Sequence, residues 1–457
     1  MDAIFESTLY TALRIDGNNI CDYLESVTNL LAEFSWVYNF RNIDIFIYDV
    51  LEKIPADWVE ELVAISQEEL WQLPFGYTKE KWPTSLKNFV TKCKKLASYR
   101  FATKKFQDTV PKDNSNLLEK LSDKKQYEVQ IMSYLIKQVC QVLKCNTVID
   151  VGSGLGYLDE ALHDNFGLCC IGLDAVPKYT LAAKERLKSD TCKHSVLHKT
   201  FEVKNTDECL LHFKAVLNEA KELHCCCIPG ISESRAASAV IVGLHSCGNL
   251  SQDMMELFCE LEDINAFICI GCCYNKIKLT NFPMSTVVKH SVSSTQKVYP
   301  EWYPSISGLR LAAHGTRSHS CSFPVSEERE KNLFYRALLQ CYIKKEQIVW
   351  KKPKRHVRTT DLADFDTYCS KMFEDHILSG DEKILRELKK LYQEKSQIFH
   401  RIRILLVLQM MLQPLWEAFV ILDRVMYFKE RNIFVEVLEM WDDSVSPRNL
   451  ALCAYKR

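Results

Sequence analysis

Three glycines at alternate positions, Gly152, Gly154 and Gly156, are the feature of the sequence that points most directly to chemistry. Glycine adopts the positive φ angles that tight turns need, and it lets a ligand approach the backbone closely. A dinucleotide-binding turn would have its third glycine at position 157, where this chain has Tyr157. The spacing therefore disfavours a pyrophosphate ligand and fits a ligand made of adenosine and a methionine tail.

Two acids flank this turn, Asp150 directly before it and Asp174 at the end of the next apolar run. A carboxylate at the place of Asp174 can accept hydrogen bonds from ribose hydroxyls, as in dinucleotide-binding folds. In the class I methyltransferase pattern, an acid at the place of Asp150 orients the methionine end of the cofactor. We therefore predict that S-adenosylmethionine is the small-molecule partner of this protein and serves as its cofactor. The predicted cofactor-binding residues are Asp150, Gly152, Ser153, Gly154, Gly156, Asp174 and His245.

Reactive side chains also follow two later apolar runs, at residues 245–249 and 272–274. Methyl transfer needs alignment and sometimes a base for the acceptor's proton. His245 is a candidate base because histidine titrates near neutral pH. The alternative is a structural histidine that caps a strand end. The candidate catalytic residues are His245, Cys272 and Tyr274.

A zinc site is a competing interpretation of the same region, formed by His245, Cys247, Cys272 and Cys273. Structural zinc usually takes its ligands from spaced pairs. The adjacent Cys272 and Cys273 would point to opposite sides if a strand continued through them. We therefore predict no metal site, with these cysteines serving as small residues that are easily buried.

A parallel sheet is needed to bring these residues together. Apolar runs at 147–151, 168–174, 195–203, 239–244 and 266–271 predict strands, and the segments between them predict helices. Ligands bind beyond the carboxyl ends of such strands, so the candidate residues should meet at one edge. Two further runs, at 434–438 and 450–454, predict a closing hairpin. The predicted fold is a doubly wound, Rossmann-like α/β sheet of the class I methyltransferase type.

Helical patterns dominate the rest of the chain. We predict an N-terminal helical domain at residues 1–116 and a class I methyltransferase domain at 117–457, with a long insertion at about 283–402. Residues 404–422 are nearly long enough to span a bilayer. The internal Glu417 is costly in hydrocarbon, so a buried helix is the preferred interpretation of this stretch.

Charge and cysteine content limit the partners and the compartment. The net charge of −1 means that nucleic acid could be bound only through a local basic face. Basic residues gather at 350–358, where a solvated loop is the simpler interpretation, and between Lys92 and Lys105. The acidic start, with Asp2 and Glu6, argues against a secretory signal. The 20 cysteines should then remain thiols, which predicts a cytoplasmic or nuclear protein.

Motifs along most of the chain resemble those of the methyltransferase-like protein 25 family, which includes a relative known as ribosomal RNA adenine dimethylase domain-containing protein. The matching stretches are residues 124–128, 148–154, 243–251, 272–274, 282–285, 336–340, 422–424 and 446–452. The resemblance implies an S-adenosylmethionine-dependent methyltransferase. Two departures are Tyr127, where relatives often have histidine, and an expanded segment at 275–280.

The acceptor is suggested only by analogy. The His-x-Cys-Gly and Cys-Cys-aromatic elements are similar to those of a tRNA 2'-O-methyltransferase family, which implies RNA ribose. The Asn/Asp-Pro-Pro-aromatic element of amino methylases is not found after the fourth predicted strand, so methylation of a base amino group is not supported. We expect RNA, with its ribose 2'-hydroxyl, in preference to protein as acceptor. The alternative, from another class, is a scaffold or interaction protein that binds the cofactor without catalysis.

Overall fold

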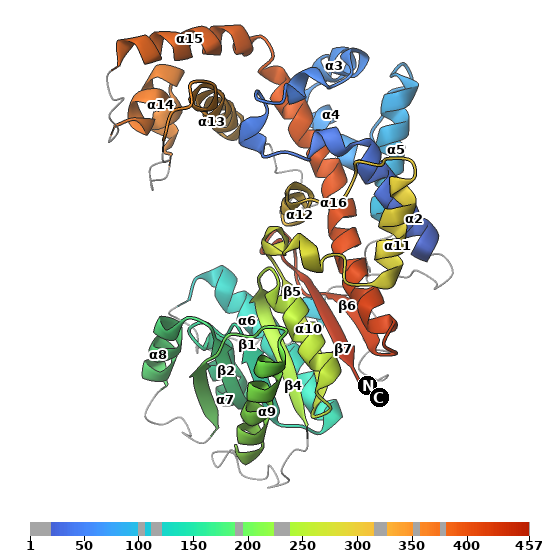
Figure 1. Ribbon diagram of the computed structural model, residues 1–457, viewed down its shortest axis with the longest axis vertical. Coiled ribbons are helices and arrows are strands. Elements are labelled where there is room, and N and C mark those ends of the chain that lie inside the picture. The colour runs from blue at the N-terminus through green and yellow to red at the C-terminus, as the bar shows by residue number, and fades with distance from the viewer. Residues whose placement is uncertain are drawn as a thin grey trace.

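The computed structural model describes residues 20–98, 106–110, 121–187, 195–223, 238–314, 327–350, 357–374 and 381–456. Figure 1 shows two lobes, an α/β lobe below and a helical lobe above. The long helix α16 (His400–Lys429) runs from the helical lobe down to the sheet and connects the two.

A seven-stranded sheet forms the α/β lobe, in the order β3-β2-β1-β4-β5-β7-β6. The parallel strands are β1 (Thr147–Val151), β2 (Cys169–Asp174), β3 (Val196–Thr200), β4 (Ala239–Ser246) and β5 (Ile264–Gly271). Strand β7 (Leu450–Tyr455) pairs antiparallel with both β5 and β6 (Phe434–Glu439). This order confirms the predicted doubly wound sheet and its closing hairpin.

Helices cover both faces of the sheet, as continuous apolar strands require. Val148, Cys170 and Val240 pack on one face together with α6 (Asp123–Leu143) and α7 (Tyr157–Phe166). Their neighbours along the strands, including Ile149, Ile171 and Ile241, pack on the other face. That face is covered by α9 (Asp207–Glu222), α10 (Leu250–Glu260) and the end of α16, and Figure 1 shows α9 and α10 in front of the sheet. Helix α8 (Pro177–Arg186) lies against β2 and β3.

The helical lobe is built from two parts of the chain. The first contributes α2 (Ile20–Glu33), α3 (Ala56–Val63), α4 (Gln67–Trp71) and α5 (Thr84–Ser98). The second contributes α11 (Thr286–Gln296), α12 (Ile306–Ala312), α13 (Glu327–Lys345), α14 (Phe365–Met372), α15 (Glu382–Ser396) and most of α16. Short 3-10 helices are η1 (Ser35–Val37), η2 (Asn42–Asp44), η3 (Val50–Glu52), η4 (Leu73–Phe75), η5 (Phe106–Thr109), η7 (Tyr274–Lys276), η8 (Leu279–Asn281) and η9 (Thr359–Leu362).

Buried side chains from both parts form a single hydrophobic core, whose first and last residues in the sequence are Ile20 and Leu422. Polar contacts also join them, since Thr295 Oγ1 donates to Thr28 Oγ1 (2.7 Å) and Trp302 Nε1 donates to the Tyr38 hydroxyl (3.0 Å). In this core the apolar faces of α2 and α5 are covered by α11 and α16. Described residues of the predicted N-terminal domain (1–116) therefore pack against described residues of the insertion predicted at about 283–402, while the domain boundaries themselves stay a prediction.

Helix α16 is the one helix in the described part of the chain that is long and apolar enough to cross a membrane. In its most apolar window, 83% of the residues are buried inside the protein. Gln413 Nε2 donates to Glu417 Oε2 (3.0 Å), so the polar residues of this stretch have partners within the fold. These contacts support the interpretation of residues 404–422 as a buried helix.

Candidate cofactor and acceptor site

The glycine turn follows β1 directly and has the backbone that its sequence predicts. Gly152, Gly154 and Gly156 have φ angles of 81°, 58° and 73°, a region that favours glycine. The N–H of Gly152 donates to the Leu173 carbonyl (2.7 Å), which ties the turn to β2. A Cβ atom on Gly156 would lie 2.5 Å from Cε1 of His198. A larger residue at position 156 would therefore be excluded by both backbone angle and space.

Asp174 holds this turn from the end of β2. Its Oδ2 accepts a hydrogen bond from the N–H of Gly154 (3.0 Å), and its Oδ1 accepts one from the N–H of Val176 (2.8 Å). Each carboxylate oxygen has more than one acceptor site. Asp174 can therefore anchor the turn and still accept hydrogen bonds from a ligand.

Asp150 is buried at the end of β1, behind the turn, with 2% of its surface exposed. Its Oδ1 has no hydrogen-bond partner among the described residues. Burial, with a contribution from the nearby Asp174 carboxylate, raises the pKa of Asp150 to about 7. A buried acceptor without a donor is costly to a fold, so this oxygen is suited to a donor supplied by a ligand.

A cavity of about 580 Å³ opens at the carboxyl ends of β1, β2, β3 and β4. This volume is in the range of small-molecule sites, and the position matches the switch point where doubly wound sheets bind ligands. Gly152 and Asp174 line it, whereas Asp150 lies behind the wall. The other lining residues are Val151, Leu173, Ala175, Phe201, Glu202, Val203, Lys204, Asn205, Thr206, Cys247, Asn249, Leu250, Asp253, Lys278 and Asn281.

Several of these lining residues were not predicted. The third strand was expected to extend to residue 203, but β3 ends at Thr200, so Phe201 and Val203 lie in the loop that borders the cavity. Asp253 comes from the first turn of α10, where burial raises its pKa to about 6. Phe201 and Val203 could have been identified by their place just after a strand. They were missed because the predicted strand extended beyond the observed end of β3.

His245 lies near the end of β4, at an irregularity in the pairing with β5 between Leu244 and Ser246. Its φ of 67° is unusual for a residue with a side chain and turns the imidazole out of the strand pattern. The ring contacts Glu128 of α6, with 2.9 Å between Nε2 and Oε2. The side chain of His245 is 32% exposed and that of Glu128 only 3%.

Glu128 is a site residue that the sequence analysis missed. Burial alone would raise its pKa, but the hydrogen bond and charge interaction with His245, together with interactions with Ser446 and Lys124, outweigh burial and lower it. An ionised Glu128 fixes the histidine tautomer with hydrogen on Nε2, which leaves the lone pair on Nδ1. The only sequence signal was that Glu128 closes the first of the matching stretches.

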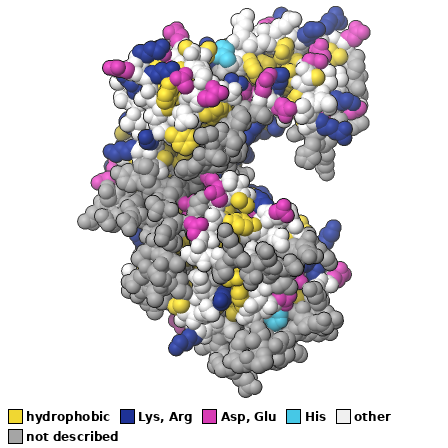
Figure 2. Space-filling model, turned by 180° about the vertical axis from the view of Figure 1, so that it is seen from behind, with side chains coloured by type: hydrophobic (Ala, Val, Ile, Leu, Met, Phe, Trp, Pro, Cys, Tyr) yellow, Lys and Arg dark blue, Asp and Glu magenta, His cyan; other side chains and the backbone are white. Residues whose placement is uncertain are grey.

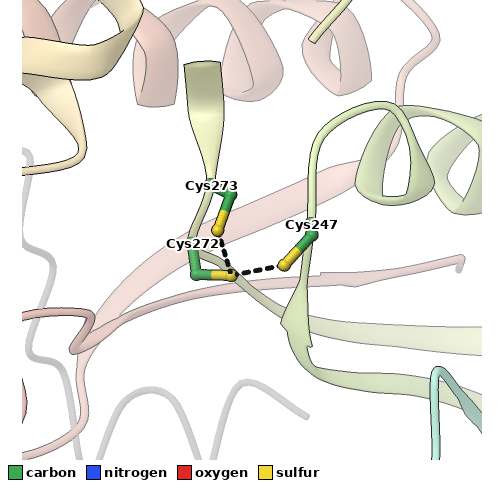
Figure 3. Close-up of side chains that lie close together, drawn as sticks. All are labelled: Cys247, Cys272 and Cys273. Carbon is green, nitrogen blue, oxygen red and sulfur yellow. Dashed lines mark hydrogen bonds between the residues drawn. The ribbon is translucent and has the colours of Figure 1, made fainter. Parts of the chain in front are cut away.

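Three thiols converge after the ends of β4 and β5, as Figure 3 shows, and two of them, Cys247 and Cys272, donate to the His245 carbonyl (3.4 Å each). The Sγ atoms of Cys247 and Cys272 are 2.9 Å apart, and those of Cys272 and Cys273 are 3.6 Å apart. Strand β5 ends at Gly271, so the assumption that adjacent cysteines would point apart is wrong here. The hydrogen bond from Cys272 lowers the pKa of Cys247 to about 5, whereas the pKa of Cys272 is raised. Cys247 borders the cavity, so it links the thiols to the cofactor region.

Tyr274, the third candidate catalytic residue, is buried in the core of the helical lobe. The guanidinium of Arg424 lies 5.1 Å from the centre of its ring. Tyr274 is not among the residues that line the cavity. His245 and Cys272 are likewise not among those residues, so the catalytic role of Tyr274 stays a prediction.

Arg424 and the neighbouring Asp423 contact several of the stretches that carry the family resemblance, although these stretches are far apart in the sequence. Arg424 Nη2 donates to Ser251 Oγ (2.9 Å), next to the α10 start. Asp423 is fully buried and accepts hydrogen bonds from the N–H groups of Met284 (2.9 Å) and Ser285 (2.9 Å). The stretches at 243–251, 272–274, 282–285 and 422–424 therefore meet as one support behind the thiols.

The two basic regions named above are only partly described. Lys92, Lys94 and Lys95 lie exposed on α5 of the helical lobe. Figure 2 shows basic and acidic side chains interspersed over the described surface of that lobe in its view. Arg100, Lys104, Lys105 and residues 351–356 lie outside the described residues.

Comparison with known proteins places this site in a wider context. Residues 124–280 match the model of a family described as "Methyltransferase domain". The chain is 22% identical over 474 residues to "Probable methyltransferase-like protein 25" of Homo sapiens, with 76% of each chain covered. It is 21% identical over 470 residues to the Mus musculus protein of the same name, with 76% of this chain and 77% of that one covered. The predicted resemblance is thereby confirmed.

Solved structures were also compared. The plantazolicin methyltransferase BpumL in complex with SAH is 13% identical, covers 74% of this chain and 91% of its own, and has a TM-score of 0.23. Its complex with a triazolic desmethylPZN analog and SAH is 11% identical, covers 66% and 95%, and has a TM-score of 0.21.

Proposed function

We propose that this protein, in which residues 124–280 match the model of a methyltransferase domain, uses S-adenosylmethionine to methylate RNA, at a ribose 2'-hydroxyl. The observation that supports this cofactor is the buried Asp150 oxygen behind the glycine turn that Asp174 anchors, because this oxygen has no hydrogen-bond partner in the described part of the chain. When bound, S-adenosylmethionine supplies an electrophilic methyl group.

The cavity offers complementary groups for each part of this cofactor. The free acceptor sites of Asp174 suit the two ribose hydroxyls. Phe201 and Val203 provide apolar surface for a purine. Asp150 suits the positively charged methionine end, directly or through water, because an ionised carboxylate in a buried place favours a cationic partner.

A hydroxyl acceptor must lose a proton when its oxygen is methylated. Nδ1 of His245 has the lone pair for that proton, because Nε2 is held by Glu128 Oε2 at 2.9 Å. The Glu128 carboxylate would stabilise the imidazolium that forms, as an acid behind a catalytic histidine does. A base of this kind is needed by a hydroxyl more than by a neutral amine or a thiolate, which supports a ribose acceptor.

Charge around the site supports a polyanionic acceptor. Lys124, Lys125, Lys276 and Lys278 are exposed and form what we call the basic rim. Lys278 lines the cavity, Lys276 favours ionisation of Cys247, and Lys124 lies 3.9 Å from Glu128. A local basic surface is what a protein of net charge −1 needs in order to contact phosphates. The similarity of residues 245–248 and 272–274 to a tRNA 2'-O-methyltransferase family points the same way.

Transfer of a labelled methyl group tests the acceptor. Purified protein and S-adenosylmethionine with a labelled methyl group are incubated with RNA and protein fractions of cells that lack the protein. The proposal predicts label that ribonuclease removes and protease does not, in a 2'-O-methyl nucleoside after digestion. Label in protein would contradict the RNA acceptor. The absence of label in every fraction would instead favour a scaffold that binds the cofactor without catalysis.

The cellular location is a separate proposal. We place the protein in the cytoplasm or nucleus, where the exposed edge of the thiol cluster would stay reduced. Microscopy of the tagged full chain, compared with markers of both compartments and of the secretory pathway, tests this placement.

A further inference from the structure

We propose that Cys247, Cys272 and Cys273 form a binding site for a thiophilic metal ion, with zinc as the expected ion. The three Sγ atoms lie within 4.8 Å of one another, beside the cofactor cavity. This inference goes beyond the proposed methyl transfer and does not depend on it. It departs from the expectation that no metal is bound, which rested on the direction of adjacent side chains in a strand.

The backbone of two strand ends creates the convergence. Cys247 follows the irregularity at His245, and the φ of 67° at that residue turns the chain towards β5. Cys272 and Cys273 follow the last residue of β5, and Cys273 has φ −95° and ψ 69°, outside the strand region. The alternation of a strand therefore does not apply: the thiol of Cys272 points toward that of Cys247, and the thiol of Cys273 points toward that of Cys272 (Figure 3).

The spacing of the sulfur atoms is close to what one ion requires. Zn–S bonds of about 2.3 Å in a tetrahedron place the sulfur ligands about 3.8 Å apart. The distance from Cys272 Sγ to Cys273 Sγ is already 3.6 Å. The distance from Cys272 Sγ to Cys247 Sγ is 2.9 Å, so an ion would widen this pair by about 0.9 Å. Side-chain rotation supplies a shift of that size.

The charges around the thiols fit a bound cation. Three thiolates and one Zn²⁺ leave a net charge of −1 at the site. The cationic side chains of Lys276 and Arg448 lie near the three thiols. Two nearby cations would thus offset the remaining charge, which a fully protonated thiol cluster does not need.

Three protein ligands leave one tetrahedral position for a further donor. Sites of this kind, with an open fourth position, are typical of catalytic zinc, whereas structural zinc is closed by four protein ligands. Cys247 borders the cavity, so the open position would be accessible to water or to an acceptor group. The competing outcome for these thiols is a disulfide between Cys247 and Cys272.

Metal analysis of the full chain tests this site. The protein is purified with a reductant and without chelator, dialysed against zinc-free buffer, and analysed by inductively coupled plasma mass spectrometry. We expect about one zinc per chain, as for a single tetrahedral site. Replacement by Co²⁺ should give sulfur-to-cobalt charge-transfer bands and the strong d–d bands of tetrahedral cobalt. Neither readout involves methyl transfer.

Matched serine variants identify the ligands. Cys272→Ser should lose at least tenfold in metal affinity (about 1.4 kcal/mol) and should lose the charge-transfer bands. Cys341→Ser, which changes another half-buried cysteine in α13, should bind like the wild type. Circular dichroism and thermal unfolding show whether each variant is folded. If Cys272→Ser does not fold, Cys247→Ser tests the same site.

Three results would overturn the proposal. One is a folded, reduced wild-type chain that holds no stoichiometric metal and gives no tetrahedral cobalt spectrum. Another is a folded Cys272→Ser or Cys247→Ser chain with wild-type metal content. The third is a mass two daltons lower, with a Cys247–Cys272 cross-linked peptide and no metal binding after reduction. Failure of cofactor binding alone would leave these readouts unchanged and would bear only on the proposed function.

Discussion

Nε2 of His245 lies 2.9 Å from Oε2 of Glu128, although the two residues are 117 positions apart in the chain. Helix α6 precedes the sheet and places Glu128 under the loop that ends β4. This contact makes a buried carboxylate the support of the candidate base, and it leaves Nδ1 as the ring nitrogen able to accept a proton.

Substitution of this pair should reduce turnover far more than it weakens cofactor binding, to which His245 is also predicted to contribute. We expect His245→Ala to lower the single-turnover rate by about 10²- to 10⁴-fold, the usual contribution of a general base. Glu128→Gln should cause a smaller loss, because the amide can still hold the ring but does not stabilise its positive form. Stopped-time methyl transfer and calorimetry of cofactor binding measure the two effects separately. Unchanged turnover in folded His245→Ala would reduce His245 to a structural residue.

Asp150 should couple pH to both stability and cofactor binding. Its pKa in the folded protein is about 7, above the ordinary 3.8, mainly because of burial. The folded state therefore holds a proton that the unfolded state has lost between about pH 4 and pH 7, and the free energy of unfolding falls as pH rises through this window. Binding of the positively charged cofactor should strengthen as pH rises through about 7, because Asp150 becomes ionised.

The variant Asp150→Asn separates these two effects. At pH 8 we expect it to be more stable than the wild type by about 1 kcal/mol or more, since each pKa unit corresponds to about 1.36 kcal/mol. It should also bind S-adenosylhomocysteine and S-adenosylmethionine more weakly. Urea denaturation and calorimetry at pH 6 and pH 8 measure both quantities. A variant that is less stable at pH 8 and binds normally would refute this role for Asp150.

The basic rim should determine how salt affects RNA binding. We expect the double variant Lys276→Ala/Lys278→Ala to reduce the slope of log affinity against log salt by about one per lysine. Lys389→Ala/Lys390→Ala removes the same charge from exposed positions on α15 and should leave the slope unchanged. Fluorescence anisotropy with a short labelled RNA at several salt concentrations measures the slope. Equal slopes for both double variants would argue against phosphate contacts at this rim.

Asp423 should contribute strongly to the stability of the fold, because it holds together the stretches that meet behind the three thiols. Asp423→Ala would leave the buried N–H groups of Met284 and Ser285 without their acceptor. We expect the free energy of unfolding to fall by about 2–5 kcal/mol, the cost of breaking a buried charged network. Asp366→Ala, at an exposed acid of α14, is the matched control and should change stability little. A loss below about 0.5 kcal/mol, the usual range for surface changes, would mean that this network does not stabilise the fold.

The sheet and the glycine turn could be predicted from the sequence because their signals are local. Runs of apolar residues and three spaced glycines determine strands and a turn within a few positions. Strand ends have a weaker local signal than the strands themselves. The third strand was predicted to end at residue 203, and this error left Phe201 and Val203 out of the predicted site. The direction of Cys272 and Cys273 likewise depended on where β5 ends, which is set by its pairing with β4 and β7.

Contacts between distant segments could not be predicted in this way. Nothing near Glu128 in the sequence shows that it meets His245, since the helix pattern indicates only that one face of α6 is buried. Nor does the sequence show that α2 and α11 pack against one another. The sequence pattern of a helix indicates that one of its faces is buried. Only the folded structure shows which segment of the chain covers that face.

Calorimetric titration with S-adenosylhomocysteine tests the central claim most directly. We predict binding of one molecule per chain by the wild type, and an affinity at least about tenfold lower, or about 1.4 kcal/mol, for Asp174→Ala. The matched variant Asp164→Ala changes an exposed acid of α7 and should bind like the wild type. A folded wild-type chain that releases or absorbs no heat and shows no ligand-induced thermal stabilisation would contradict the claim. Full affinity in Asp174→Ala would contradict the proposed place of the cofactor.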